Sequence, residues 1–233
     1  MTNSVTDKSG TPDPEATEAV VALTREGRPV ELNEDIDPIA AASSLIAVLR
    51  SRASETEMLG RLPDATVADL EKARLFDLLV PKTYGGLQCS LGTFVDVLAE
   101  LGRGDGSVAW VVAIVSANIW MAATFYEKRV TDRVFTDGNF RTASVLIPRE
   151  IKTKRVENGI LIEEGLWNFN SGIYHGHWDI LGIPVFDHAG RFIDNGSALV
   201  PKSELRLLHD WDSIGLRGSG STSVAAKKCL CPG

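Results

Sequence analysis

The chain has 233 residues, of which 44% are hydrophobic and 24% charged, so for most of its length it cannot be a fibrous or disordered protein. Its formal net charge of −7 argues against nucleic acid and anionic membrane surfaces as partners. Cysteines at positions 89, 229 and 231 are too few for a disulfide framework, and the opening residues lack the pattern of a secretory signal, so we expect a cytoplasmic protein.

Residues 1–35 are rich in Thr, Glu, Asp, Pro and Gly and have no lasting apolar period. Such a segment cannot bury enough apolar surface to order itself. We therefore expect a disordered acidic leader, to which we assign no function.

Residues 36–139 have helical periodicity and predict an N-terminal α-helical domain. Asp64 is the expected N-cap of a second helix, and Ser90 opens a third. The apolar faces of these three helices are Leu45, Val48 and Leu49; Val67, Leu70 and Ala73; and Leu91, Phe94, Val95, Leu98 and Leu101.

The segment Gly106 to Tyr126 carries no charge and has about the length of a membrane span. It contains several polar residues and is rich in Ala rather than Leu. Because polar groups are costly in lipid, we expect a buried core helix and no membrane partner.

Residues 140–233 change to a period of two and predict a middle β-domain, an antiparallel barrel or sandwich. Asn158-Gly159 predicts a type I′ hairpin. Further turns are expected at Ser171-Gly172, at Asp187 to Gly190 and at Asn195-Gly196. Helices followed by strands give an α+β fold class. The sequence ends in a strand-like pattern, so we expect the sheet to be completed by further chain or by another subunit.

Four motifs then carry a family resemblance: Leu79 to Gly86 (LVPKTYGG), Leu101 to Trp110 (LGRGDGSVAW), Trp167 to Gly172 (WNFNSG) and Asp210 to Val224 (DWDSIGLRGSGSTSV). In this order they resemble the two-component, reduced-flavin-dependent aromatic hydroxylases, a branch of the acyl-CoA dehydrogenase superfamily. The resemblance implies an N-terminal helical domain, a middle β-domain and a C-terminal four-helix bundle, usually in a homotetramer. The bundle is missing here, so the chain would hold one wall of a flavin site.

The function implied by the resemblance is that of an oxygenase component. It would accept reduced flavin, FMN or FAD, from a separate NAD(P)H-dependent flavin reductase. With molecular oxygen it would hydroxylate a small aromatic or polycyclic substrate through a flavin hydroperoxide, in a site that excludes water.

The same resemblance assigns roles to the segment around Ser171. Ser171 matches a catalytic hydroxyl beside the central-ring nitrogen of the flavin, and Phe169 matches an aromatic that packs on the isoalloxazine. Trp167, Asn170 and Gly172 complete the cofactor-binding segment. The alternative is that Ser171-Gly172 is only a turn and that the aromatic residues belong to the core.

Further assignments fall outside that segment. Ser144 aligns with a catalytic hydroxyl that faces flavin and substrate; otherwise it is a solvent-facing strand serine. Asn118 and Trp120 are expected to contact substrate. Asn118 stands where many phenol-hydroxylating relatives have a histidine, and since an amide cannot act as a base, the substrate is not a simple phenol or the base lies elsewhere. The alternative for Asn118 is a buried amide that ties two elements together.

Arg217 lies in a loop rich in Gly and hydroxyl residues. It is either a flavin contact or part of a tight turn.

A metal site is not expected. His175 and His177 would share a face if they lay on a strand, but no third ligand has a suitable spacing. Cys229 and Cys231 fit two inward positions of a strand rather than a zinc site.

Two other functions stay open. In an acyl-CoA dehydrogenase, FAD would take a hydride from an acyl-CoA, but those enzymes more often have W-I-[TS]-N and T-E-P where this chain has Phe169-Asn170-Ser171 and Ser144-Val145-Leu146. The third possibility is a truncated non-catalytic relic or oligomerisation module.

Overall fold

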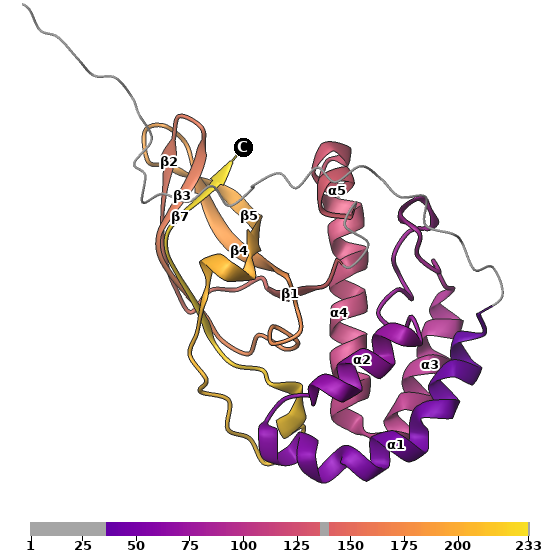
Figure 1. The fold of residues 1–233 in the computed structure, drawn as a ribbon. Coiled ribbons are helices and arrows are strands. Elements are labelled where there is room, and N and C mark those ends of the chain that lie inside the picture. The colour runs from indigo at the N-terminus through magenta and orange to yellow at the C-terminus, as the bar shows by residue number, and fades with distance from the viewer. Residues whose placement is uncertain (1–35, 136–139, 233) are drawn as a thin grey trace, which may run out of the picture.

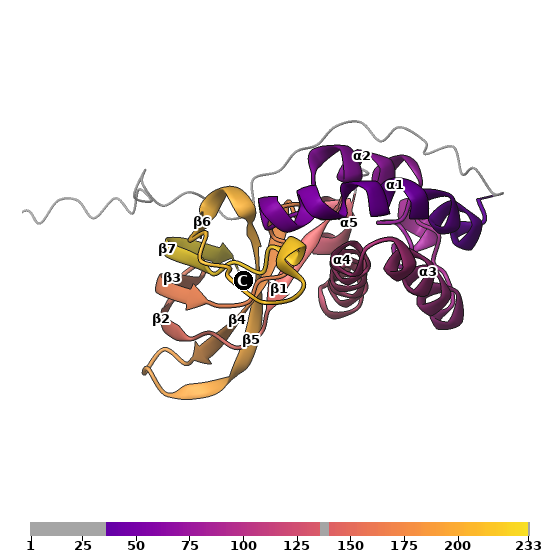
Figure 2. The ribbon, with the colours of Figure 1, turned by 90° about the horizontal axis from the view of Figure 1, so that it is seen from below.

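The computed structural model describes residues 36–135 and 140–232, so the predicted leader at residues 1–35 lies outside the described residues. Helices come first and strands follow, as the sequence predicts. Figure 1 shows the two parts side by side, with α4 between the other helices and β1. Figure 2 shows the same arrangement from below. The helices are α1 (Pro38–Leu59), α2 (Asp64–Lys72), the 3-10 turn η1 (Lys82–Tyr84), α3 (Leu91–Gly104), α4 (Gly106–Phe125) and α5 (Lys128–Phe135).

The helix starts follow capping rules with one correction. Ser90 caps α3 by accepting a hydrogen bond from a backbone amide of the first turn, as predicted. Asp64 is not the N-cap of α2, because the helix already begins at Asp64 and Pro63 precedes it in an extended conformation. The Asp64 carboxylate instead pairs with Arg61 at 2.7 Å.

The apolar face of α3 is centred differently from the prediction. Phe94, Val97 and Leu101 are its buried residues, whereas Leu91 and Val95 are more than half exposed. The observed face repeats at intervals of three and four residues from Phe94, which is the helical period.

α4 joins the two parts of the molecule. Val111, Val115 and Ile119 are completely buried in the helical core. Among the described residues only α4 is long and apolar enough to cross a bilayer, but its buried face packs within the protein, so the predicted core helix is confirmed. Trp110 and Trp120 remain about half exposed.

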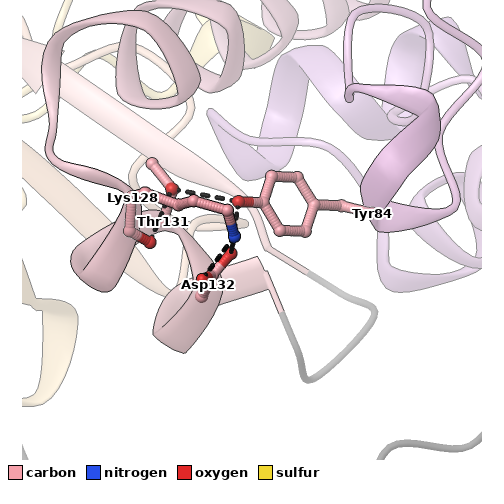
Figure 3. Close-up of polar contacts among 4 residues, drawn as sticks. All are labelled: Tyr84, Lys128, Thr131 and Asp132. Carbon is pink, nitrogen blue, oxygen red and sulfur yellow. Dashed lines mark hydrogen bonds and ion pairs between the residues drawn. The ribbon is translucent and has the colours of Figure 1, made fainter.

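A polar cluster anchors the turn that contains η1 (Figure 3). The Tyr84 hydroxyl donates to Asp132 Oδ1 at 2.7 Å and lies 3.0 Å from Thr131 Oγ1, both on α5. Lys128 pairs with the same carboxylate, and the Tyr84 ring stacks on Phe135 with centroids 4.7 Å apart. The first family motif is therefore fixed to the end of the helical part.

The strands form two sheets. The three-stranded sheet has the order β1-β4-β5, and the four-stranded sheet has the order β2-β3-β7-β6. The prediction of purely antiparallel pairing is wrong for β1, which is parallel to β4. A parallel pair requires a long crossover, and here the connection runs through β2 and β3. The strands are β1 (Thr142–Val145), β2 (Glu150–Val156), β3 (Gly159–Trp167), β4 (Trp178–Phe186), β5 (Phe192–Pro201), β6 (Arg206–Leu207) and β7 (Val224–Pro232).

The expected turns have three outcomes. The hairpin between β2 and β3 is present, but its loop is Glu157 and Asn158. Neither Glu157 nor Asn158 has the positive φ that the central residues of a type I′ turn need, so the predicted turn type is wrong. The turn at 187–190 is confirmed by a bond from the Gly190 amide to the Asp187 carbonyl. The turn at 195–196 is wrong, because these residues pair with β4 inside β5.

The β-domain core lies between the two sheets. Its fully buried members include Ile162, Trp167, Leu181 and Val200. Cys229 is buried there and Cys231 is partly buried against it, so both cysteines lie at inward strand positions as predicted.

Candidate functional site

The turn after β3 brings Ser171 against α4. Phe169 has a φ of 62°, a left-handed conformation that is uncommon for a bulky residue. Gly172 has a φ of 81°, and a Cβ at this position would lie 3.0 Å from Val115 Cγ2. Glycine therefore allows both the backbone conformation and the close approach to the helix. The predicted turn at Ser171-Gly172 is confirmed.

Ser171 takes part in a cluster of buried hydroxyls. The indole Nε1–H of Trp110, on α4, donates to Ser171 Oγ at 3.1 Å. Ser171 Oγ lies 2.7 Å from Ser221 Oγ, and Ser221 Oγ lies 2.8 Å from Ser219 Oγ. Three family motifs that are far apart in sequence thus meet at the Ser171 hydroxyl.

Ser144 and Asn118 form a second polar contact. Ser144 Oγ donates to Asn118 Oδ1 at 2.8 Å, and Asn118 Nδ2 donates to the carbonyl of Thr142 at 3.3 Å. Both ends of the amide are used, so Asn118 ties α4 to β1 as the alternative interpretation expected. Because the Ser144 proton is used on Asn118, its oxygen keeps lone pairs for a further donor.

A groove with a volume of about 490 Å³ lies beside this contact. Ser144 and Phe169 both line this groove, so the structure brings these two predicted site residues together. Phe169 is 71% exposed, and Leu146 and Ile147 are also exposed, so the wall is largely apolar. The complete lining is Ser144, Val145, Leu146, Ile147, Pro148, Arg149, Asn168 and Phe169.

Phe169 is supported by the loop that contains the last family motif. The Phe169 ring meets Trp211 edge-on, with centroids 6.3 Å apart. Trp211 Nε1–H donates to the carbonyl of Arg217 at 3.0 Å. The guanidinium of Arg217 pairs with Asp212 at 2.8 Å and with Glu57 at 3.6 Å. Arg217 therefore fixes the loop behind Phe169, and two carboxylates offset its charge.

The structure does not bring Trp120 to the groove. Trp120 follows Asn118 by two residues, which turns it about 200° around α4. Its ring is exposed and lies edge-on to Phe125 at 6.4 Å.

Trp167 and Asn170 lie beneath the site rather than on its surface. Trp167 is fully buried, and its Nε1–H donates to the carbonyl of Gly182 at 3.0 Å. Asn170 is fully buried and donates a hydrogen bond from its amide to Asp179 Oδ2. These two side chains support the backbone that carries Phe169 and Ser171.

Sequence reasoning missed Asp179. Burial raises the pKa of this carboxyl to about 8, against which its hydrogen bond from Asn170 has a smaller opposite effect. Asp179 Oδ1 and Asn170 Oδ1 have no hydrogen-bond partner among the described residues. The available signal was a single acidic residue in an otherwise apolar strand, Trp178–Phe186.

The histidines do not form the strand pair that was considered. His175 is buried in the turn after Ser171, and His177 is exposed before β4. Burial, with Arg61 and Arg141 nearby, lowers the pKa of His175 to about 4. The described part of the chain contains no group of three or more His, Cys, Asp or Glu side chains that could hold a metal ion.

A helical domain is followed by two sheets, with a hydroxyl-lined turn after β3 and an apolar groove between that turn and residues 144–149; solved structures share this acyl-CoA dehydrogenase-like fold. Residues 40–132 match the family model described as acyl-CoA dehydrogenase, N-terminal domain. The crystal structure of the HsaA monooxygenase from M. tuberculosis has a TM-score of 0.78 and 36% identity and covers 84% of this chain and 53% of its own. XiaF from Streptomyces sp., in complex with FADH2 and glycerol, has a TM-score of 0.79 and 29% identity over 84% of this chain and 49% of its own.

Among curated relatives, the oxygenase subunit HsaA of a flavin-dependent monooxygenase from Mycobacterium tuberculosis is 37% identical over 195 residues, 83% of this chain and 48% of the relative. The oxygenase component of p-hydroxyphenylacetate 3-hydroxylase from Acinetobacter baumannii is 28% identical over 81% of this chain and 44% of its own length. Residues 40–132 therefore match the N-terminal domain of acyl-CoA dehydrogenases, and most of the chain is similar to oxygenase subunits of flavin-dependent monooxygenases. The chain spans about half the length of the curated relatives it matches.

Proposed function

We propose that this chain is part of the oxygenase component of a two-component flavin-dependent monooxygenase that hydroxylates an aromatic substrate. The observation that carries the proposal is the turn after β3, where an exposed Phe169 borders an apolar groove and Ser171 is held by Trp110. The named relatives are oxygenase components that share this half of the fold.

The residues present fit one face of a flavin. An isoalloxazine is a flat aromatic ring with polar edges, and such ligands bind to apolar walls that carry a few placed polar groups. Phe169, Leu146 and Ile147 supply the apolar wall, and Ser144 supplies a hydroxyl. A bound reduced flavin, FMN or FAD, would supply the electrons that activate molecular oxygen.

The chain's own residues would then have separate tasks. Phe169 packs against the ring, and its strained backbone holds the side chain in the open groove. Ser171, which is buried two residues after Phe169 and outside the groove lining, would present a neutral hydroxyl to the flavin without adding a charge to a dry site. Ser144 contacts flavin or substrate. Asn118 orients Ser144 through its amide oxygen rather than acting as a base.

The remaining assignments concern residues behind the groove, the partners of the chain and its location. Trp167, Asn170, Gly172 and Arg217 would hold the cofactor segment in place from behind. Trp120 would contact substrate only if the substrate bound at the exposed face of α4 where its ring lies. We further propose a separate NAD(P)H-dependent flavin reductase as partner, a homotetramer, a cytoplasmic location, and domain limits at 36–139 and 140–233.

The test compares two reactions. The chain is given chemically reduced FMN or FAD, oxygen and a panel of phenols and larger aromatics, and hydroxylated product is measured. A parallel assay measures dye reduction with acyl-CoA esters, which is the reaction of the dehydrogenase alternative. Product from the first assay supports the proposal. Dye reduction alone favours the dehydrogenase, and absence of any flavin binding overturns both enzyme functions for this polypeptide and favours the non-catalytic alternative.

A further inference from the structure

The Ser171 hydroxyl stands at one end of a chain of three serines. Ser171 Oγ and Ser221 Oγ are 2.7 Å apart, and Ser221 Oγ and Ser219 Oγ are 2.8 Å apart. All three side chains are buried. Each hydroxyl has one proton, so the protons along the chain point either toward Ser171 or away from it.

Trp110 fixes one of the contacts of Ser171. An indole nitrogen can only donate, so Ser171 Oγ accepts the bond from Trp110 at 3.1 Å. Ser171 then has one proton and one lone pair left. Ser221 uses one of these, and the other has no partner among the described residues.

The surroundings of Ser219, the last of the three hydrogen-bonded serines, decide which way the hydroxyl protons point. Ser219 is 2% exposed, and within the described residues its side chain has Ser221 as its one hydrogen-bond partner. If the protons pointed away from Ser171, the proton of Ser219 would be buried without an acceptor. If they point toward Ser171, Ser219 is left only with unfilled lone pairs, which buried groups tolerate better than an orphaned donor.

We propose that Ser219, Ser221 and Trp110 are positioning residues that hold the Ser171 hydroxyl as a hydrogen-bond donor toward its ligand. The proposal rests on the proposed function, in which the ligand is a flavin. With two incoming hydrogen bonds, Ser171 has only its proton left to offer, and successive bonds in such a chain strengthen one another. The ligand atom it selects is a ring nitrogen that has a free lone pair.

The first experiment measures this selection by binding. Affinities are determined for oxidised FMN and for 5-deaza-FMN, in which a C–H replaces the central-ring nitrogen. One hydrogen bond predicts roughly fivefold tighter binding of FMN by the unmodified chain. Ser171→Ala should reduce this ratio to about one. Ser221→Ala should reduce it two- to threefold, since the Ser171 proton is then free to occupy any of its staggered positions.

Ser116→Ala is the matched control. Ser116 is a fully buried serine on α4, the helix that carries Trp110, and its hydroxyl has no hydrogen-bond partner among the described residues. This variant should keep the fivefold ratio. General damage to the fold would lower both affinities together and leave the ratio unchanged, so the ratio separates positioning from structural support. An unchanged ratio in Ser221→Ala, beside a lost ratio in Ser171→Ala, overturns the proposal and leaves the flavin site standing.

The second experiment needs no flavin. Neutron diffraction from crystals of the deuterated chain locates hydroxyl deuterons directly. Deuterons bonded to Ser219 and Ser221 and directed toward Ser171 support the proposal, whereas a Ser171 deuteron directed at Ser221 overturns it. If no flavin binds in the first experiment, the proposed function fails. The neutron result still decides in which direction the hydroxyl protons of the three serines point.

Discussion

Replacement of Asp179 by asparagine should change how the stability of the protein depends on pH. Burial of Asp179 raises its pKa from the ordinary 3.8 to about 8. Between these values the folded protein holds a proton that the unfolded chain has released. Stability therefore falls as pH rises through this window, by roughly 1.4 kcal/mol for each pH unit. Over the whole window the contribution is about 6 kcal/mol.

His175 has the opposite dependence in part of the same range. Burial lowers its pKa from 6.5 to about 4. Between these values the unfolded chain holds a proton that the folded protein lacks, so stability rises with pH. The two effects offset each other from about pH 4 to 6.5. From pH 6.5 to 8 only Asp179 of these two groups still titrates, and its contribution should lower stability by about 2 kcal/mol.

The assay is urea unfolding followed by tryptophan fluorescence at pH 5, 6, 7 and 8. An asparagine side chain has nearly the same shape as an aspartic acid side chain and cannot ionise, so Asp179→Asn should become more stable up to pH 6.5 and stay level above it. The difference between the two proteins isolates Asp179, since every other group is shared. Parallel pH profiles for the two proteins would refute the claim that Asp179 is buried as the neutral acid.

Three further predictions concern α4 and the turn after β3. Ser171→Ala should raise the fraction of consumed oxygen released as hydrogen peroxide by about fivefold, the loss of one hydrogen bond, with unchanged circular dichroism; unchanged coupling of oxygen use to product contradicts the role of Ser171. Gly172→Ala should destabilise the fold by about 1 to 3 kcal/mol in urea, because φ is positive and the new Cβ would press on Val115; a cost near zero would show that the turn relaxes. Ser116→Ala should leave stability unchanged or raise it by up to about 1 kcal/mol, since its buried hydroxyl has no partner among the described residues; a clear loss would reveal a bond to water or to another group.

The sequence predicts the parts of the fold that depend on local patterns. The N-cap at Ser90 and the turn at Ser171-Gly172 follow from capping and turn chemistry within a few residues. The parallel pairing of β1 with β4 depends on strands separated by a hairpin, which no local pattern encodes. α4 could be predicted as a core helix because its long uncharged stretch contains several polar residues and is rich in Ala rather than Leu.

The positions of the candidate site residues follow less directly from local sequence patterns, as Phe169 shows. Strand alternation would place Trp167 and Phe169 on the same face. The left-handed backbone at Phe169 breaks this alternation, so Trp167 is buried and Phe169 is exposed. A positive φ at a phenylalanine has no sequence signature. Asp179 was missed because its partner, Asn170, comes from another segment and is brought to it only by folding.

The two hydroxyls assigned to the site come from different segments, yet both are hydrogen-bonded to α4. Trp110 contacts Ser171 and Asn118 contacts Ser144. Eight residues separate these contacts, which corresponds to about 12 Å along a helix. α4 thus sets the distance between the contacts to Ser171 and to Ser144. Because both contacts come from one continuous helix, their spacing is fixed by the rise of α4 and not by the loops that line the groove.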